Sequence, residues 1–317
     1  MEYLILILSL AGIVLGADFL VKGAVVVARK CRVSSFVIGA VIVGIGTSLP
    51  ELVVSTVGAI GGNSEVAIGN VVGSNIFNVF AILGLTALFF PIVVSRENMK
   101  FEIPFCIAVS VLLMLLVYNF FVVGEPRLGR WDGAALLLVF TAFMWISLRR
   151  GKNSAAAVGE SVEEENKSLW FAAFSILGGL AALIVSSNFF VDEAVAIARK
   201  LGVSDAFISI TLLACGTSLP ELAASVTAAV KKDTDMALGN IIGSNIFNAT
   251  MILGTASLIT PLTTGKIGLV DYGAMILAAV LPMIFGIRGK ITRFEGLLML
   301  LCYAAYTWYI VTYVMAV

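Results

Sequence analysis

The heptapeptide GTSLPEL at residues 46–52 recurs, letter for letter, at residues 216–222. Further on, GSNIFN at residues 73–78 recurs at residues 243–248. Both copies lie inside long apolar stretches, so each sets one acidic side chain, Glu51 or Glu221, at membrane depth. A charge there costs about 2.5–3.5 kcal/mol on insertion scales. A cost repeated at matching positions predicts that the two carboxylates meet at one site, with a cation as their partner.

Composition places the whole chain in the membrane. Of its 317 residues, 60% are apolar and only 13% are charged, whereas a soluble domain has about 45–50% apolar and about 25% charged residues. At roughly 20 residues per span, the apolar stretches predict an all-α polytopic membrane protein with ten transmembrane helices. The predicted spans are 3–28, 36–60, 66–90, 101–122, 131–148, 168–197, 206–230, 236–260, 268–287 and 294–316.

Loop charge predicts the orientation of these spans. The net charge is zero, which implies no nucleic-acid partner. Most of the 20 basic residues fall in the loops after spans 1, 3, 5, 7 and 9. The positive-inside rule then puts these loops in the cytoplasm and both termini on the extracytoplasmic side of the plasma membrane. Four cysteines without paired spacing are expected to be free thiols, at Cys31, Cys106, Cys215 and Cys302.

The repetition extends well beyond the two motifs. Residues 16–91 align without gaps on residues 186–261. This divides the chain into a first five-helix repeat at 1–148, a polar cytoplasmic linker at 149–167 and a second five-helix repeat at 168–317. An odd number of spans per repeat forces the second copy to enter from the opposite face. The predicted architecture is therefore two inverted-topology repeats, which is typical of secondary transporters that bind substrate at the midplane.

Proline chemistry predicts a break beside each glutamate. Pro50 lacks an N–H and its ring clashes with the carbonyl of Gly46, so span 2 should kink there and release carbonyl oxygens. Helical spacing places Thr47, Ser48, Glu51 and Ser55 on one face. In the second copy, the matching residues are Thr217, Ser218, Glu221 and Ser225.

Spans 3 and 8 supply the surfaces that face these breaks. The polar stripe of span 3 is Asn70, Ser74 and Asn78, and that of span 8 is Asn240, Ser244 and Asn248. Beside each stripe, small residues (Gly69 and Gly73, Gly239 and Gly243) follow a spacing that lets helices pack closely. The resulting set of donors is entirely oxygen. Such a set suits Ca²⁺, and a subset suits Na⁺, whereas soft metals prefer Cys or His. The chain has no histidine.

Several polar residues near the motifs have a structural alternative. Asn75 and Asn245 lie one position off the stripes, and we expect interhelical hydrogen bonds from them, as we do from Asn70 and Asn240. Ser55 and Ser225 fit either role. Asp18 and Lys22 lie four residues apart on span 1, which favours an internal ion pair over lining an aqueous path.

GTSLPE followed by GSNIFN, with both motifs duplicated, resembles the alpha repeats of the sodium/calcium exchanger family. The alpha-repeat motifs cover 44–80 and 214–250, and the resemblance extends over nearly the whole chain. It implies ten helices in two inverted halves, with helices 2, 3, 7 and 8 forming the ion core and helices 1 and 6 sliding across it. The large regulatory domain of animal exchangers has no counterpart, because only the short linker occupies its place.

The resemblance also implies a set of metal-binding residues. Calcium ligands fall on Glu51, Glu221 and the carbonyls of Thr47 and Thr217. Sodium sites additionally draw on Ser48, Ser74, Ala214, Ser218 and Ser244, and the amides fall on Asn78 and Asn248. Some members carry an aspartate at one amide position, but both are asparagine here, so the formal charge of the site is that of two carboxylates. This matches one Ca²⁺.

The function expected from these residues is Ca²⁺/Na⁺ exchange by alternating access, without an enzymatic step or a cofactor, in a protein functional as a monomer in the lipid bilayer. A Ca²⁺/H⁺ antiporter remains an alternative, since both glutamates could load protons. A cation channel is a further alternative, although channels usually build a pore from an oligomeric ring. A membrane-embedded hydrolase is the least favoured alternative, because this sequence has no histidine and shows no nucleophile–base pairing.

Overall fold

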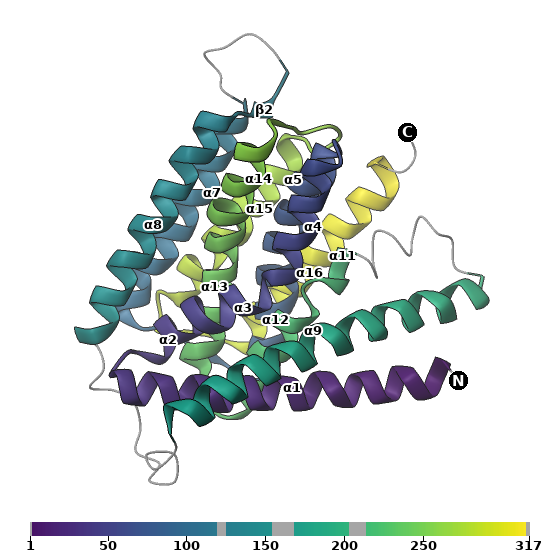
Figure 1. The fold of residues 1–317 in the computed structure, drawn as a ribbon. Coiled ribbons are helices and arrows are strands. Elements are labelled where there is room, and N and C mark those ends of the chain that lie inside the picture. The colour runs from purple at the N-terminus through teal and green to yellow at the C-terminus, as the bar shows by residue number, and fades with distance from the viewer. Residues whose placement is uncertain (1, 119–124, 154–167, 203–213, 315–317) are drawn as a thin grey trace.

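The computed structural model describes residues 2–118, 125–153, 168–202 and 214–314, and these are almost entirely helical (Figure 1). Among them, eight helices are long and apolar enough to cross a membrane, or nine if a bent pair at 35–60 is counted as one span. The nine agree with nine of the ten predicted spans. The tenth, predicted at 206–230, begins outside the described residues, and its described part contains the short apolar helix α12 (Leu219–Val230).

The first half of the chain contains five of these spans. They are formed by α1 (Glu2–Cys31); by α2 (Ser35–Ile38), the π-helix η1 (Gly39–Val43), α3 (Gly44–Thr47) and α4 (Leu49–Ile60); by α5 (Ser64–Phe77), η2 (Asn78–Leu83) and α6 (Gly84–Phe89); by η3 (Asn98–Glu102) and α7 (Ile103–Tyr118); and by α8 (Arg130–Asn153). Helix α8 continues five residues past its predicted end at 148, into the segment predicted as linker. The rest of that segment lies outside the described residues.

The second half repeats this order. Its elements are α9 (Leu169–Lys200); α11 (Ala214–Gly216) and α12; α13 (Thr234–Phe247), η6 (Asn248–Ile252) and α14 (Leu253–Ile259); α15 (Leu269–Gly286); and α16 (Arg293–Tyr309) with η7 (Ile310–Val314). The four cysteines are free, and only Cys31 is exposed.

Both halves are broken just before the duplicated proline of the motif. In the first, α3 ends at Thr47 and α4 begins at Leu49, with a bend of 47° between the two helical segments. The break falls at Ser48, two residues before Pro50. Proline has no N–H to donate, and the N–H groups in the first turn of a helix have no partner within the helix, so Pro50 is tolerated in the first turn of α4. In the second half, α12 likewise begins at Leu219, with Ser218 before it and Pro220 in its first turn.

The helices that carry the asparagines are also irregular at matching points. A π-helical segment begins at Asn78 in span 3 and at Asn248 in span 8. Such segments shift the backbone hydrogen bonds by one residue and are frequent at functional sites. These two spans are the centre of the molecule, since 72% of the apolar window in residues 64–89 and 83% of that in 234–259 is buried, against 11% in 293–312.

Two short antiparallel strand pairs tie the halves to each other. Strand β1 (Ile92–Val93) pairs with β4 (Lys290–Ile291), and β2 (Arg127–Leu128) pairs with β3 (Leu262–Thr263). Each pair joins one strand from each half. Strands β1 and β3 follow spans 3 and 8 at equivalent positions, yet each pairs with a strand of the opposite half.

Helices α1 and α9 form a separate layer that runs across the base of the bundle in Figure 1. They pack antiparallel and backbone to backbone, since a Cβ added at Gly16 would lie 2.9 Å from the carbonyl oxygen of Gly179. Close approach of this kind needs small residues. An ion pair between Lys200 and Glu2, at 2.6 Å, links the far ends of the two helices.

Candidate ion-binding site

Two hydrogen bonds cross between the halves at the helix breaks. The hydroxyl of Ser48 donates to Oε1 of Glu221 at 2.9 Å, and the hydroxyl of Ser218 donates to Oε1 of Glu51 at 3.1 Å. All four side chains are 0% exposed. Each carboxylate is therefore held by the serine of the opposite half, and the two breaks meet at one place. The sequence analysis expected this meeting.

The other carboxylate oxygens at this place have no hydrogen-bond partner among the described residues. Unpartnered buried oxygen atoms are rare in folded proteins, and each calls for an explanation such as a bound ion. At the crossed breaks these atoms are Glu51 Oε2, Glu221 Oε2, Thr217 Oγ1, Ser74 Oγ, Asn78 Oδ1 and Asn248 Oδ1. All six belong to residues predicted as metal ligands.

The remaining predicted ligands take different positions in the two halves. The hydroxyl of Thr47 lies 3.3 Å from both the Oδ1 of Asn240 and the carbonyl of Gly44, whereas that of its counterpart Thr217 has no hydrogen-bond partner in the described part of the chain. The hydroxyl of Ser244 donates to the carbonyl of Gly44 at 3.2 Å, whereas that of Ser74 is unpartnered. Ala214 begins helix α11, directly before the second break. The site is thus symmetric in sequence but not in its hydrogen bonds.

Asn70 and Asn240 donate hydrogen bonds from their side-chain amides to the broken helices. The Nδ2 of Asn70 donates to the carbonyl of Glu51 at 3.3 Å and to Ser55 at 3.0 Å. The Nδ2 of Asn240 makes the same two contacts, with the carbonyl of Glu221 and with Ser225. The serines are therefore bonded to asparagines, and these four residues brace the helix that carries each glutamate.

Close packing of small residues positions span 8 against span 2. A Cβ added at Gly243 would overlap the backbone of Ala40, and one added at Gly239 would overlap that of Phe36. The predicted small-residue contact is thereby confirmed for this pair. For Gly69 and Gly73 the equivalent facing segment, residues 203–213, lies outside the described residues.

The donor chemistry at the crossed breaks is that of a hard cation. Two carboxylates, two amide oxygens and two hydroxyls are buried without hydrogen-bond partners on the broken helices and on the spans that pack against them, and such oxygen ligands suit Ca²⁺, which takes six to eight of them. No group of three or more His, Cys, Asp or Glu residues forms a metal site in the described part of the chain. The available negative charge at the breaks is therefore that of Glu51 and Glu221. A further buried carboxylate, Glu102, lies among Arg150, Glu97 and Asp235, and its Oε2 has no hydrogen-bond partner among the residues that the structure describes. No motif in the sequence marks this residue.

A broken-helix, multi-pass fold around buried carboxylates defines a membrane transporter for a cation. Comparison with known proteins agrees. The model of the sodium/calcium exchanger protein family matches residues 1–149 and 171–312. The chain is 35% identical to the sodium/calcium exchanger MaX1 of Methanosarcina acetivorans, over 96% of this chain and 97% of that protein. It is 34% identical to the inner membrane protein YrbG of Escherichia coli, over 87% and 86% respectively.

Solved structures show the same relationship. The sodium-calcium exchanger NCX_Mj, in crystals soaked with 10 mM Na⁺ and no Ca²⁺, superposes with a TM-score of 0.83 at 32% identity and covers 98% of both chains. The chain belongs to the sodium/calcium exchanger family. It is a multi-pass membrane protein and a cation/Ca²⁺ antiporter, and its family is one of transporters.

Proposed function

We propose that the chain exchanges Ca²⁺ for Na⁺, and that both ions compete for the site at the crossed helix breaks. The observation that carries this proposal is the cluster of six buried, unpartnered oxygen atoms, headed by Glu51 Oε2 and Glu221 Oε2. A protein interior that leaves two carboxylate oxygens without hydrogen bonds bears a large desolvation cost. A bound cation offsets that cost. Thr47 and Ala214 complete the proposed ligand set through their backbone carbonyls, and Ser48, Ser218 and Ser244 through their hydroxyls.

Coupling follows from the charge of the site. One Ca²⁺ neutralises Glu51 and Glu221, and so do monovalent ions acting together. A neutralised site can be carried through a low-dielectric barrier, whereas an empty site would carry two desolvated charges. The return of an empty site is therefore disfavoured. After the site releases an ion on one side of the membrane, it must bind another ion there before it can return. The net direction depends on the gradients, and inward Na⁺ would extrude Ca²⁺.

We further propose ten helices in two inverted repeats that work by alternating access. In Figure 1, the first break runs upward from α3 to α4, while the second runs downward from α11 to α12. Opposite directions at equivalent positions support inverted topology. The exchange of strand partners between halves supports it as well, and the separate α1–α9 layer is the element expected to slide. On this proposal, both termini lie outside the cytoplasm, and a monomer in the plasma membrane suffices.

Flux measurements in vesicles test the proposal. Purified protein is reconstituted into proteoliposomes, and ⁴⁵Ca²⁺ uptake is driven once by an outward Na⁺ gradient and once by a pH gradient with Na⁺ strictly absent. Saturable uptake driven by Na⁺ alone is expected. Uptake driven by protons without Na⁺ would identify a Ca²⁺/H⁺ antiporter, and uptake without any counter-ion would identify a channel.

A further inference from the structure

Four asparagines next to the carboxylates form two relays that join spans 3 and 8. The Nδ2 of Asn75 donates to the backbone carbonyl of Asn245 at 3.1 Å, and the Nδ2 of Asn245 donates to that of Asn75 at 3.1 Å. The Nδ2 of Asn248 then donates to Oδ1 of Asn75 at 3.2 Å, and the Nδ2 of Asn78 donates to Oδ1 of Asn245 at 3.1 Å. All four side chains are at least 97% buried.

The direction of each relay is set at its start. A backbone carbonyl can only accept, so it fixes the first amide with its NH₂ toward the carbonyl and its oxygen away from it. That oxygen can only accept in turn, so the second amide must present its NH₂ to it. The oxygen of the second amide is then left to face elsewhere, and the Oδ1 atoms of Asn78 and Asn248 are indeed unpartnered.

We propose that Asn75 and Asn245 are positioning residues that keep the oxygens of Asn248 and Asn78, rather than their NH₂ groups, turned toward the ion. An asparagine amide is nearly symmetric in shape, and only its hydrogen bonds distinguish the two ends. A flipped amide would direct hydrogen-bond donors at a cation. The relay starts on one half and ends on the other, so each half orients an amide of its partner.

This inference rests on the proposed role of Asn78 and Asn248 as ligands, and a double-mutant cycle separates the two. Asn248→Ala and Asn78→Ala are each expected to raise the KM for Ca²⁺ about tenfold in Na⁺-driven uptake, which corresponds to about 1.4 kcal/mol. Asn75→Ala should raise KM by several-fold with Vmax less affected. Combined with Asn248→Ala, it should add less than twofold, because the residue it orients is already absent.

The matched control is the pair Asn75→Ala and Asn78→Ala. These residues lie on one helix but belong to different relays, so their effects on KM should multiply. If Asn78→Ala and Asn248→Ala leave KM unchanged, the proposed ligand set is wrong. If they raise KM while Asn75→Ala does not, or if Asn75→Ala multiplies fully with Asn248→Ala, the positioning role is wrong. Thermal unfolding of each variant in detergent, with and without Ca²⁺, confirms that the fold is retained.

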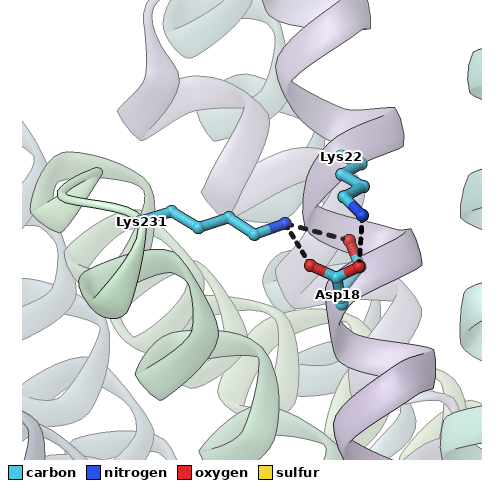
Figure 2. A network of polar contacts seen from close by, with 3 residues as sticks. All are labelled: Asp18, Lys22 and Lys231. Carbon is cyan, nitrogen blue, oxygen red and sulfur yellow. Dashed lines mark hydrogen bonds and ion pairs between the residues drawn. The ribbon is translucent and has the colours of Figure 1, made fainter.

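An ion pair between the two halves, which has no symmetry-related counterpart in the sequence, supports a second inference. Asp18 on α1 contacts two lysines, Lys22 on the same helix at 2.6 Å and Lys231 at 2.7 Å (Figure 2). The Nζ of Lys231 also donates to the backbone carbonyl of Asp18 at 3.2 Å. Lys231 ends helix α12, so this contact fastens α1 to the helix that carries Glu221.

The positions related to this pair by the repeat cannot form an ion pair. Asn188 occupies the position that matches Asp18, and Gly61 occupies the one that matches Lys231. If the two halves exchange roles during transport, the opposite conformation lacks this ion pair. We infer that the Asp18–Lys231 pair biases the protein toward the conformation in Figure 1. Lys22 moves with Asp18 and provides it with a partner in either conformation.

The ratio of half-saturating Ca²⁺ concentrations on the two membrane faces tests this bias, because a change in the conformational equilibrium shifts the two in opposite directions. Lys231→Met should change the ratio about two- to fivefold, the range expected of a partly exposed ion pair. Lys22→Met is the matched control and should leave it unchanged, as should Lys231→Arg. An equal shift in Lys22→Met, or none in Lys231→Met, would overturn the inference.

Discussion

Replacing Glu221 with glutamine tests the shared carboxylate site most directly. Glutamine has nearly the same shape, and its oxygen can still accept the hydrogen bond from Ser48, which is 2.9 Å long. Only the charge is removed. Breaking one partner of a buried charge pair typically costs about 3–5 kcal/mol. We therefore expect Ca²⁺ affinity to fall by a factor of about a hundred to several thousand, which abolishes exchange at millimolar Ca²⁺ or below.

The symmetry of the site extends this expectation to Glu51. Its carboxylate has the same burial and the matching hydrogen bond from Ser218, so Glu51→Gln should be equally severe. Ser48→Ala keeps both charges and removes one hydrogen bond to a carboxylate, which is worth about 1.5–3 kcal/mol. Its loss of affinity should be smaller, at about ten- to a hundredfold.

Na⁺-driven ⁴⁵Ca²⁺ uptake into proteoliposomes measures these effects, and gel filtration together with thermal unfolding confirms folding. Glu102→Gln is the matched control, because Glu102 is also buried and has an unpartnered oxygen but has Arg150 beside it instead of the crossed serines. It should retain uptake within about twofold, as expected of a change outside the binding groups. Near-normal exchange in Glu221→Gln or Glu51→Gln would refute the shared site.

Two further predictions concern topology and packing. Cys31, the only exposed cysteine, follows span 1 and should react with a membrane-impermeant maleimide in inside-out vesicles but not in right-side-out vesicles; labelling from the opposite face would reverse the proposed orientation, and Cys31→Ser controls for the signal. Gly179→Ala places a methyl group against the backbone of Leu20, and should lower Tm by several degrees through overpacking that costs about 1–3 kcal/mol. Gly178→Ala, where no described atom lies within 4 Å of the added carbon, should change it little; equal effects would show that α1 and α9 do not pack as described.

The duplicated motifs made the meeting of the two buried carboxylates predictable. A membrane-depth carboxylate is costly wherever it occurs, so two in matching contexts could be paired from the sequence without coordinates. The same reasoning predicted a break at each proline, although the structure places the first break at Ser48 rather than at Gly46. Periodicity also predicted the internal Asp18–Lys22 pair, because residues four apart on a helix are neighbours.

Contacts between the halves were not predictable in the same way. The pairing of Ser48 with Glu221 and of Lys231 with Asp18 depends on which helices face each other, and no local pattern encodes that choice. The π-helical segments that begin at Asn78 and Asn248 have no counterpart in the apolar pattern of the sequence, which continues through them. The two-residue strands are too short to leave a recognisable alternation.

The crossed bonds explain why a duplicated chain is needed for this chemistry. Each carboxylate accepts its serine hydrogen bond from the opposite half, and the amides of Asn78 and Asn248, the proposed ligands, each donate a hydrogen bond to an asparagine of the opposite half. Neither repeat alone can therefore assemble a satisfied site. Because the sequences of the two motifs match while their hydrogen bonds differ at Thr47 and Thr217, the site is symmetric in its chemistry but not in its conformation. Reversal of that asymmetry, with Thr217 bonded and Thr47 released, would require no new residue. On the proposed mechanism, alternating access is the exchange of two conformations between the two halves around one pair of glutamates.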